Sequence, residues 1–270
     1  MFTRFYVVHL LGLAGLLSSL SYAEDSNSSS ESFSGLPNMA AIQDVREKKS
    51  TFFNYLEPMV AQVNQRIEGE RAWLHVVARQ IDLGFTLEYW QNAYLEELGS
   101  YYKVDEDIGS QAYFYQMFQR VDVLPASLVL AQAANESAWG TSRFAVEGQN
   151  LFGQWCFTKG CGLIPQGRDD SERHEVRVFD TVFDSINAYF RNINTHRQYV
   201  DLRAIREELR HLNLNLDSQY LAWGLEGYSI RGVHYIRELI DMMQYNNLAA
   251  FDQSAFYAQL NIRVNDDALK

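Results

Sequence analysis

The sequence PASLVLAQAANESAWGTSRFAVEGQNLFG, from Pro125 to Gly153, decides how we interpret this chain. Its first half is a run of apolar and small residues that carries one acid, Glu136. Pro125 suits the first position of a helix, where its missing N–H is no loss, and Gly140 is a typical stop signal. The pattern therefore predicts a helix over residues 125–140 with Glu136 near its end.

A helical period brings Gln132, Glu136 and Trp139 together on one face, next to Val129. A carboxyl group at the edge of a packed face loses hydration, which raises its pKa and keeps it protonated near neutral pH. A general acid needs that property. The plainer alternative is an exposed glutamate on a core helix, which needs no function.

Composition limits the function classes. The chain has 270 residues, of which 47% are hydrophobic, so it can bury a substantial core. Its 34 Asp and Glu against 23 Lys and Arg give a formal charge of −11, and no predicted helix carries a basic block, so we expect no nucleic-acid partner. The six histidines show no metal-binding spacing, and we expect neither a metal nor another cofactor.

The N-terminus resembles a secretory signal peptide over residues 1–23. Arg4 is followed by an apolar run, and Ser21-Tyr22-Ala23 offers a small-x-small cleavage site. A transmembrane anchor is the alternative, but the apolar run is short for a span. Two cysteines, Cys156 and Cys161, lie five positions apart and predict a small disulfide loop, as expected in an exported chain. We expect export and no stable membrane insertion after cleavage.

The rest of the chain is divided by its patterns into a flexible linker over 24–43, an N-terminal helical scaffold over 44–110, a main domain over 111–250 and a C-terminal tail over 251–270. Helices are expected from residue 44 with a kink at Pro58, and then over 70–81, 87–102, 113–120 and 125–140. Later helices are expected from 181, over 202–209 and from 235. Between them, clustered glycines and the alternating strand 175–179 predict a β-hairpin over about 154–179.

Three segments, LAQAANESAWGTSRFAVEGQNLFG, VRVFDTVFDSINAYFRNINTH and GYSIRGVHYIREL, resemble in this order the glucosaminidase domain of glycoside hydrolase family 73. The loop WCFTKGCG and the segment FFNYLEPMVAQVNQRI make the likeness to the bacterial Bax family of exported glucosaminidase-like proteins closer. This resemblance covers residues 48–248. It implies an α+β, mostly helical, lysozyme-like glucosaminidase fold with a small β-hairpin lobe.

The resemblance also implies an activity, which is hydrolysis of the β-1,4 bond after N-acetylglucosamine in peptidoglycan. The expected partner is thus a peptidoglycan glycan strand. The resemblance to the Bax family, together with the absence of wall-binding repeats, implies a Gram-negative periplasm as the compartment. Glu136 falls on the family's catalytic acid, and Tyr228 falls on a tyrosine near its reaction centre. A core contact between helices is the alternative for Tyr228. The residues that we expect to contact substrate are Gln132, Trp139, Asn150, Phe152, Trp155 and Tyr235.

The second carboxylate departs from the family pattern. Many members carry a glutamate in a Thr-x-Glu-Tyr hairpin motif, which this chain lacks. Glu175 is our candidate for this catalytic role, with an outward-facing solvated residue as its alternative; Asp169, Asp170 and Glu172 are further acids of the hairpin. The substrate's own N-acetyl group is another possible second group. A lytic transglycosylase or muramidase of the same fold, or a weakly catalytic wall-binding or assembly protein, are the alternative functions.

Overall fold

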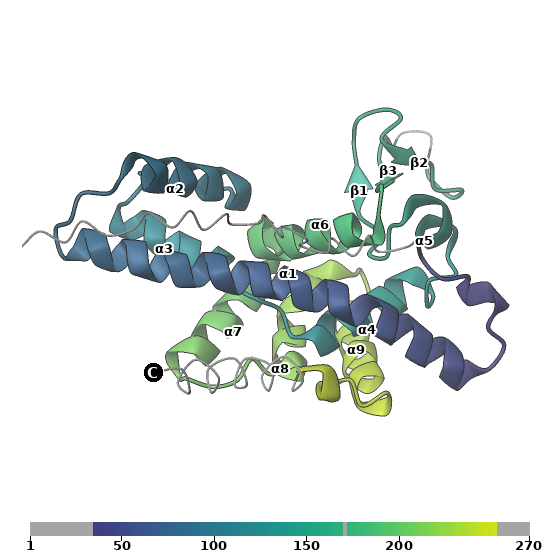
Figure 1. Ribbon diagram of the computed structural model, residues 1–270. Coiled ribbons are helices and arrows are strands. Elements are labelled where there is room, and N and C mark those ends of the chain that lie inside the picture. The colour runs from purple at the N-terminus through teal and green to yellow at the C-terminus, as the bar shows by residue number, and fades with distance from the viewer. Residues whose placement is uncertain (1–34, 170–171, 253–270) are drawn as a thin grey trace, which may run out of the picture. The chain divides into compact units, whose positions relative to one another are not determined.

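A single long helix, α1 (Val45–Asp82), runs through the part of the chain that the computed structural model describes, residues 35–169 and 172–252 (Figure 1). Asp44 caps it by accepting a hydrogen bond from Glu47 N at 2.8 Å. The helix continues through Pro58, so the first two predicted helical runs form one element. Its buried face carries apolar residues at helical spacing, from Phe52 to Val77.

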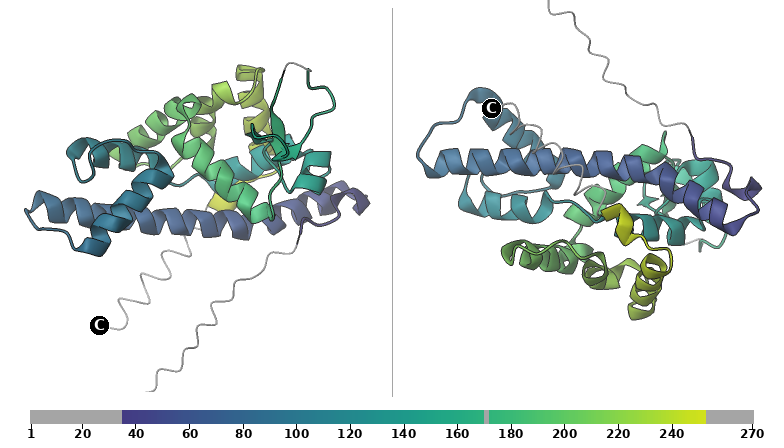
Figure 2. Two further views of the ribbon diagram at one scale, coloured as in Figure 1. Left: turned by 90° about the horizontal axis from the view of Figure 1, so that it is seen from above. Right: turned by 60° about the horizontal axis from the view of Figure 1, so that its bottom comes forward.

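Helix α1 contacts elements from both predicted parts of the chain. It packs against α3 (Gln111–Arg120), α4 (Ala126–Ser137) and α6 (Val182–Thr195), while α2 (Tyr89–Tyr102) packs against α3 and α6. The views in Figure 2 show α1 extending alongside these helices. The buried apolar residues of α1 to α4 and α6 belong to one hydrophobic core. The expected scaffold, 44–110, therefore shares its core with the main domain.

The helix that carries Glu136 ends earlier than the sequence predicts. Helix α4 stops at Ser137, and Ala138, Trp139 and Gly140 then follow with φ values of 49°, 60° and 76°. The buried Ser137 hydroxyl holds this turn, because it donates to Ala133 O at 2.6 Å and accepts from Gly140 N at 2.8 Å. This left-handed turn changes the direction of the chain directly after the helix that carries Glu136.

The β lobe is a three-stranded antiparallel sheet in the described residues. Its strands β1 (Trp155–Cys156), β2 (Gly162–Leu163) and β3 (Glu175–Arg177) lie in the order β1-β3-β2. The predicted strand over 175–179 is confirmed with a shorter extent. A Cβ atom on Gly162 would lie 2.1 Å from Val176 O, so this close strand pair requires glycine. The helix α5 (Arg143–Gly148) contacts β2 and β3.

The C-terminal helices complete the surroundings of α4. They are α7 (Val200–His211), α8 (Ser218–Ala222) and α9 (Val233–Tyr245). The 3-10 segment η2 (Arg197–Tyr199) precedes α7, and η3 (Trp223–Tyr228) joins α8 to α9. Helix α9 packs on α4 and η3. A Cβ atom on Gly224 would lie 2.3 Å from Leu202 Cα, so η3 approaches α7 as closely as only glycine permits.

The chain ends differ in part from expectation. The last residues of the predicted linker form η1 (Met39–Ala41), whose Met39 is buried near Gly140 and Phe52. At the other end, Asp252 accepts from Ser127 N at 2.9 Å and from Ser127 Oγ at 2.6 Å, so the tail begins by contacting α4. The predicted signal peptide, most of the linker and residues 253–270 lie outside the described residues.

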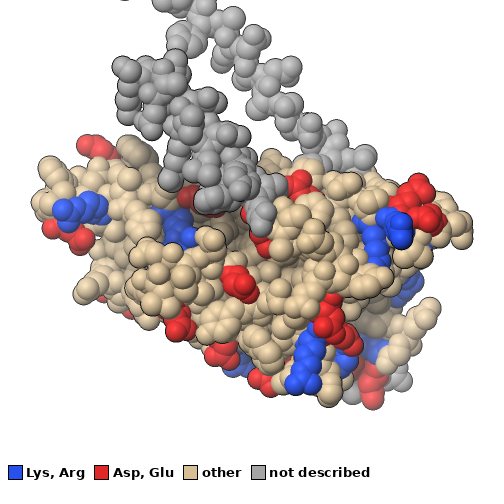
Figure 3. Space-filling view, turned by 90° about the horizontal axis from the view of Figure 1, so that it is seen from below, with Lys and Arg blue, Asp and Glu red and all other residues tan. Residues whose placement is uncertain are grey.

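The described helices include none with the length and apolar character needed to cross a bilayer. On the face that Figure 3 shows, basic side chains lie in small groups among acidic ones. The mostly helical α+β architecture with a small β lobe agrees with the predicted fold class.

Candidate active site

The carboxyl group of Glu136 lies at the last turn of α4, among residues from α9. Its hydrogen-bond partners are the phenol of Tyr235 and, at 3.4 Å, Nδ2 of Asn135. Burial raises the pKa of Glu136, and the two hydrogen bonds and Arg231 oppose this only in part. The C-terminal end of a helix also disfavours a negative charge. The site thus favours the protonated form of Glu136 more than water does.

A second layer of buried polar groups supports Tyr235. Gln132, one turn before Glu136, donates from Nε2 to Tyr235 Oη at 2.9 Å. The Tyr189 hydroxyl of α6 donates to Gln132 Oε1. Gln132 and Tyr235 are completely buried and Tyr189 nearly so. Burial is also the main cause of the raised pKa of Tyr235 and Tyr189, so both phenols stay protonated.

Aromatic rings close the site on the side of η3. Tyr228 stacks on Tyr235 with the ring centroids 5.5 Å apart and an interplanar angle of 2°. Its hydroxyl donates to Phe152 O at 3.0 Å, and the Phe152 ring stacks on Tyr189 at 4.0 Å. Burial raises the pKa of Tyr228, and Glu136 raises it further. Tyr228 is therefore fixed within electrostatic range of the acid.

One ion pair lies close enough to influence the acid. Arg231 holds Glu238 through two hydrogen bonds of 2.7 and 2.6 Å, and its guanidinium lies over the Tyr235 ring at 5.4 Å. The charge of Arg231 lowers the pKa of Glu136, while that of Glu238 raises it. Since the two charges oppose each other, burial remains the dominant influence on Glu136.

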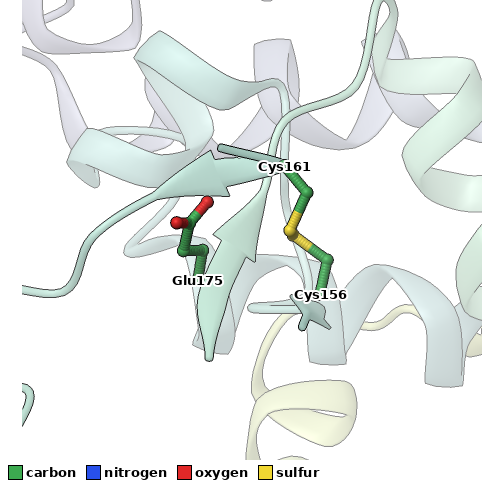
Figure 4. Close-up of side chains that lie close together, drawn as sticks. All are labelled: Cys156, Cys161 and Glu175. Carbon is green, nitrogen blue, oxygen red and sulfur yellow. A yellow bond between two sulfur atoms is a disulfide. The ribbon is translucent and has the colours of Figure 1, made fainter. Parts of the chain in front are cut away.

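Glu175 lies in the β lobe beside the Cys156–Cys161 disulfide (Figure 4) and binds backbone N–H groups. Its two oxygens accept from Gly160 N at 3.0 Å and from Gly162 N at 2.8 Å. These backbone donors lower the pKa of Glu175, and the residue is only 5% exposed. The solvated alternative for Glu175 is therefore wrong. Its carboxylate holds the loop closed by the Cys156–Cys161 disulfide, which the structure confirms.

The side chain of Asn150 also forms its hydrogen bonds within the protein. Its Nδ2 donates to Gln154 O at 2.9 Å and to Arg177 O at 2.8 Å. Its Oδ1 accepts from Phe152 N at 3.2 Å and from Gln154 N at 3.1 Å. Two donated and two accepted bonds use the full capacity of an amide side chain. Asn150 therefore shapes the turn that presents Phe152 O to Tyr228, in place of the substrate contact that the sequence suggests.

The two tryptophans predicted at the site lie in different surroundings. Trp139 packs edge-on against Phe52 and Phe53 of α1, at 5.9 and 5.4 Å, because the left-handed turn removes it from the helical face of Glu136. The predicted alignment of Trp139 with Glu136 does not form. Trp155 is 57% exposed on the β lobe, and one face of its indole stacks on His174 at 3.9 Å.

The comparisons with known proteins match this geometry to a family. Residues 111–248 match the Glucosaminidase family model, described as mannosyl-glycoprotein endo-beta-N-acetylglucosaminidase. The chain is also 30% identical over 214 residues to Protein bax of Escherichia coli (strain K12), across 79% of this chain and 75% of that protein. This chain belongs to the Bax family of glucosaminidase-domain proteins. No solved structure matches it.

The glucosaminidase domain thus brings five of the predicted residues together: Glu136, Gln132, Tyr235, Tyr228 and Phe152. Gln132, Tyr235 and Phe152 are buried, so they contact other protein groups around Glu136 and are not exposed to solvent. In the described part of the chain, Cys156, Cys161 and Glu175 are close enough together to share a metal ion. The disulfide consumes both thiolates, and the carboxylate is bound by backbone N–H groups, so this group does not fit a metal.

Sequence reasoning missed Tyr189, which lies in the helix expected from residue 181, and a buried ion cluster around Asp122. Asp122 lies 2.7 Å from Arg210 Nη2, 3.7 Å from Arg71 Nη1 and 3.8 Å from Arg206 Nε. The signals that could have found them are a tyrosine on a buried helix face and an acid inside the apolar run VDVL. Each of these side chains needs a polar partner when it is buried.

Proposed function

We propose that this protein is an exported peptidoglycan hydrolase, an endo-β-N-acetylglucosaminidase that cleaves the β-1,4 bond after N-acetylglucosamine. Glu136 is its general acid. The observation that carries the proposal is a single part-buried carboxyl group whose pKa burial raises, held by a phenol within a glucosaminidase-family domain. A raised pKa favours the protonated carboxyl group that is needed to protonate a leaving glycosidic oxygen.

In the first step, the proton of Glu136 passes to the glycosidic oxygen as its bond to C1 breaks. The carbonyl oxygen of the sugar's own N-acetyl group forms a new bond to C1 from the opposite face, which gives an oxazolinium intermediate. Glu136 is then a carboxylate and accepts a proton from the water that opens the ring at C1. The configuration at C1 is retained, and the acid is restored.

The second group in this scheme belongs to the substrate, because the carboxylates of Glu175 and Glu238 are otherwise engaged. Glu175 is bound by two backbone N–H groups, and Glu238 is paired with Arg231. Tyr228, whose hydroxyl is anchored on Phe152 O, offers a fixed oxygen that positions the N-acetyl group or the water. Trp155 offers one exposed indole face on which a sugar ring of the glycan strand stacks.

Export to the periplasm of a Gram-negative cell is part of the same proposal. It is supported by the signal-like residues 1–23 and by the Cys156–Cys161 disulfide, since such bonds persist in oxidising compartments. A glycan strand of the wall is the substrate available there.

Product analysis tests the proposal. The purified protein and its Glu136→Gln variant are incubated with purified peptidoglycan, and the products are reduced with borohydride and identified by mass spectrometry. We expect N-acetylglucosaminitol ends from the native protein and none from the variant. Muramitol ends would identify a muramidase and 1,6-anhydro ends a lytic transglycosylase, and either would overturn the proposed bond. If neither protein released products but both still bound the wall, the result would point to a binding or assembly role.

A further inference from the structure

The buried amide of Gln132 lies between two phenols and fixes the direction of the hydrogen bond that reaches Glu136. Gln132 belongs to α4, Tyr189 to α6 and Tyr235 to α9, so three separate helices must pack correctly for the chain of bonds to form. Tyr189 Oη donates to Gln132 Oε1, and Gln132 Nε2 donates to Tyr235 Oη at 2.9 Å.

The direction follows from counting protons. A phenol carries one proton, and Tyr189 keeps its own because burial raises its pKa well above the ordinary value. Because Gln132 Oε1 accepts that proton, the amide turns its N–H toward Tyr235. The oxygen of Tyr235 thus accepts from Gln132, and its single proton is directed to its other polar partner, the carboxyl group of Glu136.

We propose that Gln132 and Tyr189 are positioning residues that act through Tyr235, orient its O–H toward Glu136 and so set the pH range in which Glu136 serves as the acid. The proposal rests on the proposed function only in taking Glu136 as the catalytic acid. The chain of hydrogen bonds can be tested without activity. Neither Gln132 nor Tyr189 needs to touch substrate, which agrees with their burial.

Several other groups act on the same carboxyl group. From the elements around Glu136, the titratable, charged or polar groups that interact with it are Asn135, Tyr189, Tyr199, Tyr228, Arg231, Tyr235 and Glu238. Arg231 and Glu238 form an ion pair, and their charges act on Glu136 in opposite directions. The hydrogen bond from Tyr235 is therefore the contact whose loss should be most visible in the titration of Glu136.

Each link in the chain has a distinct consequence. A donated O–H favours the carboxylate and opposes burial, so Tyr235→Phe should move the titration midpoint of Glu136 to higher pH. Gln132→Met keeps the length of the side chain but removes both the N–H donor and the acceptor. Tyr235 then loses the donor that polarises its O–H, so its hydrogen bond to Glu136 weakens, and we expect a smaller shift of the same sign. In the double variant, Gln132→Met should add nothing to the shift from Tyr235→Phe.

Carbon-13 NMR of glutamate-labelled protein measures these midpoints directly, with the Glu136 resonance identified by its loss in Glu136→Gln. An equal shift from Gln132→Met with and without Tyr235 would overturn the proposal, because Gln132 would then act independently of Tyr235. An unchanged midpoint in Tyr235→Phe would overturn it as well. This readout stands even if the protein releases no product, so failure of the proposed function remains distinguishable.

Activity and stability provide the matched readouts. We expect Gln132→Met to lower the cleavage rate up to about tenfold, as loss of one neutral hydrogen bond can do, and to move the alkaline limb of the rate profile to higher pH. The control is Tyr113→Phe, which also removes a buried phenol, one that donates to Leu95 O at 2.5 Å. It should lower the Tm without moving the limb.

The native protein gives a readout that needs no variant. The hydroxyl proton of Tyr235 should appear as a slowly exchanging NMR signal whose position changes as Glu136 titrates. A Tyr235 hydroxyl signal that is indifferent to the titration of Glu136 would contradict the proposed direction of the bond.

Discussion

Asp122 and Glu136 are both sheltered carboxyl groups, one before helix α4 and one at its end, yet their environments have opposite effects. Burial raises the pKa of each, but at Asp122 the charges of Arg206, Arg71 and Arg210 outweigh burial and lower its pKa. At Glu136 burial prevails. One environment stabilises a charge and the other stabilises a proton. Burial alone therefore does not decide the direction in which the pKa of a sheltered acid shifts; the neighbouring groups do.

The neighbours also explain what each site does for the fold. Asp122 and the guanidinium of Arg206, which donates to Gln119 O, Val123 O and Asn194 Oδ1, connect the start of α4 with α6 and α7. Glu136 is held by the phenol of Tyr235 and by the amide of Asn135 at 3.4 Å. Neither group carries a charge that would neutralise the carboxylate. The Asp122 cluster anchors the helix, and the anchored helix presents Glu136.

The largest expected effect is on activity. Glu136→Gln removes the proton donor with no change in shape, and we expect the rate of peptidoglycan cleavage to fall by about 100- to 10,000-fold. Release of reducing ends measures the effect. Glu147→Gln, which changes an exposed glutamate on α5, is the matched control and should retain activity. Native activity in Glu136→Gln would show that Glu136 is not the general acid.

The next effect is on stability. Asp122→Asn leaves three arginines without their shared anion, and loss of one partner from a buried ion pair costs about 3–5 kcal/mol. Urea unfolding should show this loss, while Asp201→Asn, on the exposed side of α7, should change little. A variant of Asp122 with native stability would show that the cluster does not anchor α4.

A third carboxylate sharpens the comparison. Glu175 is stabilised by N–H groups of the disulfide loop rather than by arginines. Replacing both cysteines with serine should cost about 2 kcal/mol, as expected for so short a loop. It should also move the titration midpoint of Glu175 toward the ordinary glutamate value, because the loop no longer holds its donors in place. An unchanged Glu175 midpoint in carbon-13 NMR would show that the loop is ordered without the bond.

The smallest effect is the pH dependence of stability, which should have opposite signs at the two sites. The folded-state pKa of Asp122 is lowered, so its contribution is present above about pH 4 and is lost as the pH falls. The folded-state pKa of Glu136 is raised, so its contribution is present below about pH 4 and is lost as the pH rises. Glu136→Gln should thus gain Tm relative to the native protein at alkaline pH. The reverse trend would contradict the assigned environment of Glu136.

Sequence patterns predicted what depends on local periodicity. Helical spacing located the helix of Glu136, and the alternation over 175–179 located strand β3. The same reasoning failed at Trp139, because a left-handed turn held by the Ser137 hydroxyl interrupts the helical period. No spacing rule encodes that turn before the structure is seen.

Contacts between distant segments were beyond sequence reasoning for a different reason. Tyr189 and Gln132 are 57 positions apart, and Asp122 and Arg206 are 84 apart. Tyr189, Gln132 and Asp122 are polar residues within apolar patterns, which indicates that each needs a partner but not which one. Glu175 was assigned as a catalytic or solvated acid, since its backbone donors at Gly160 and Gly162 carry no side-chain signal.

The central claim is that Glu136 works as an acid because burial in its environment raises its pKa. The most direct measurement is the rate of glycan cleavage against pH, compared with the carbon-13 titration of Glu136 in the same protein. Our account predicts that the rate falls as the pH rises through the titration midpoint of Glu136, and that this midpoint lies above the ordinary glutamate value. A rate that stays constant while Glu136 loses its proton would contradict the claim.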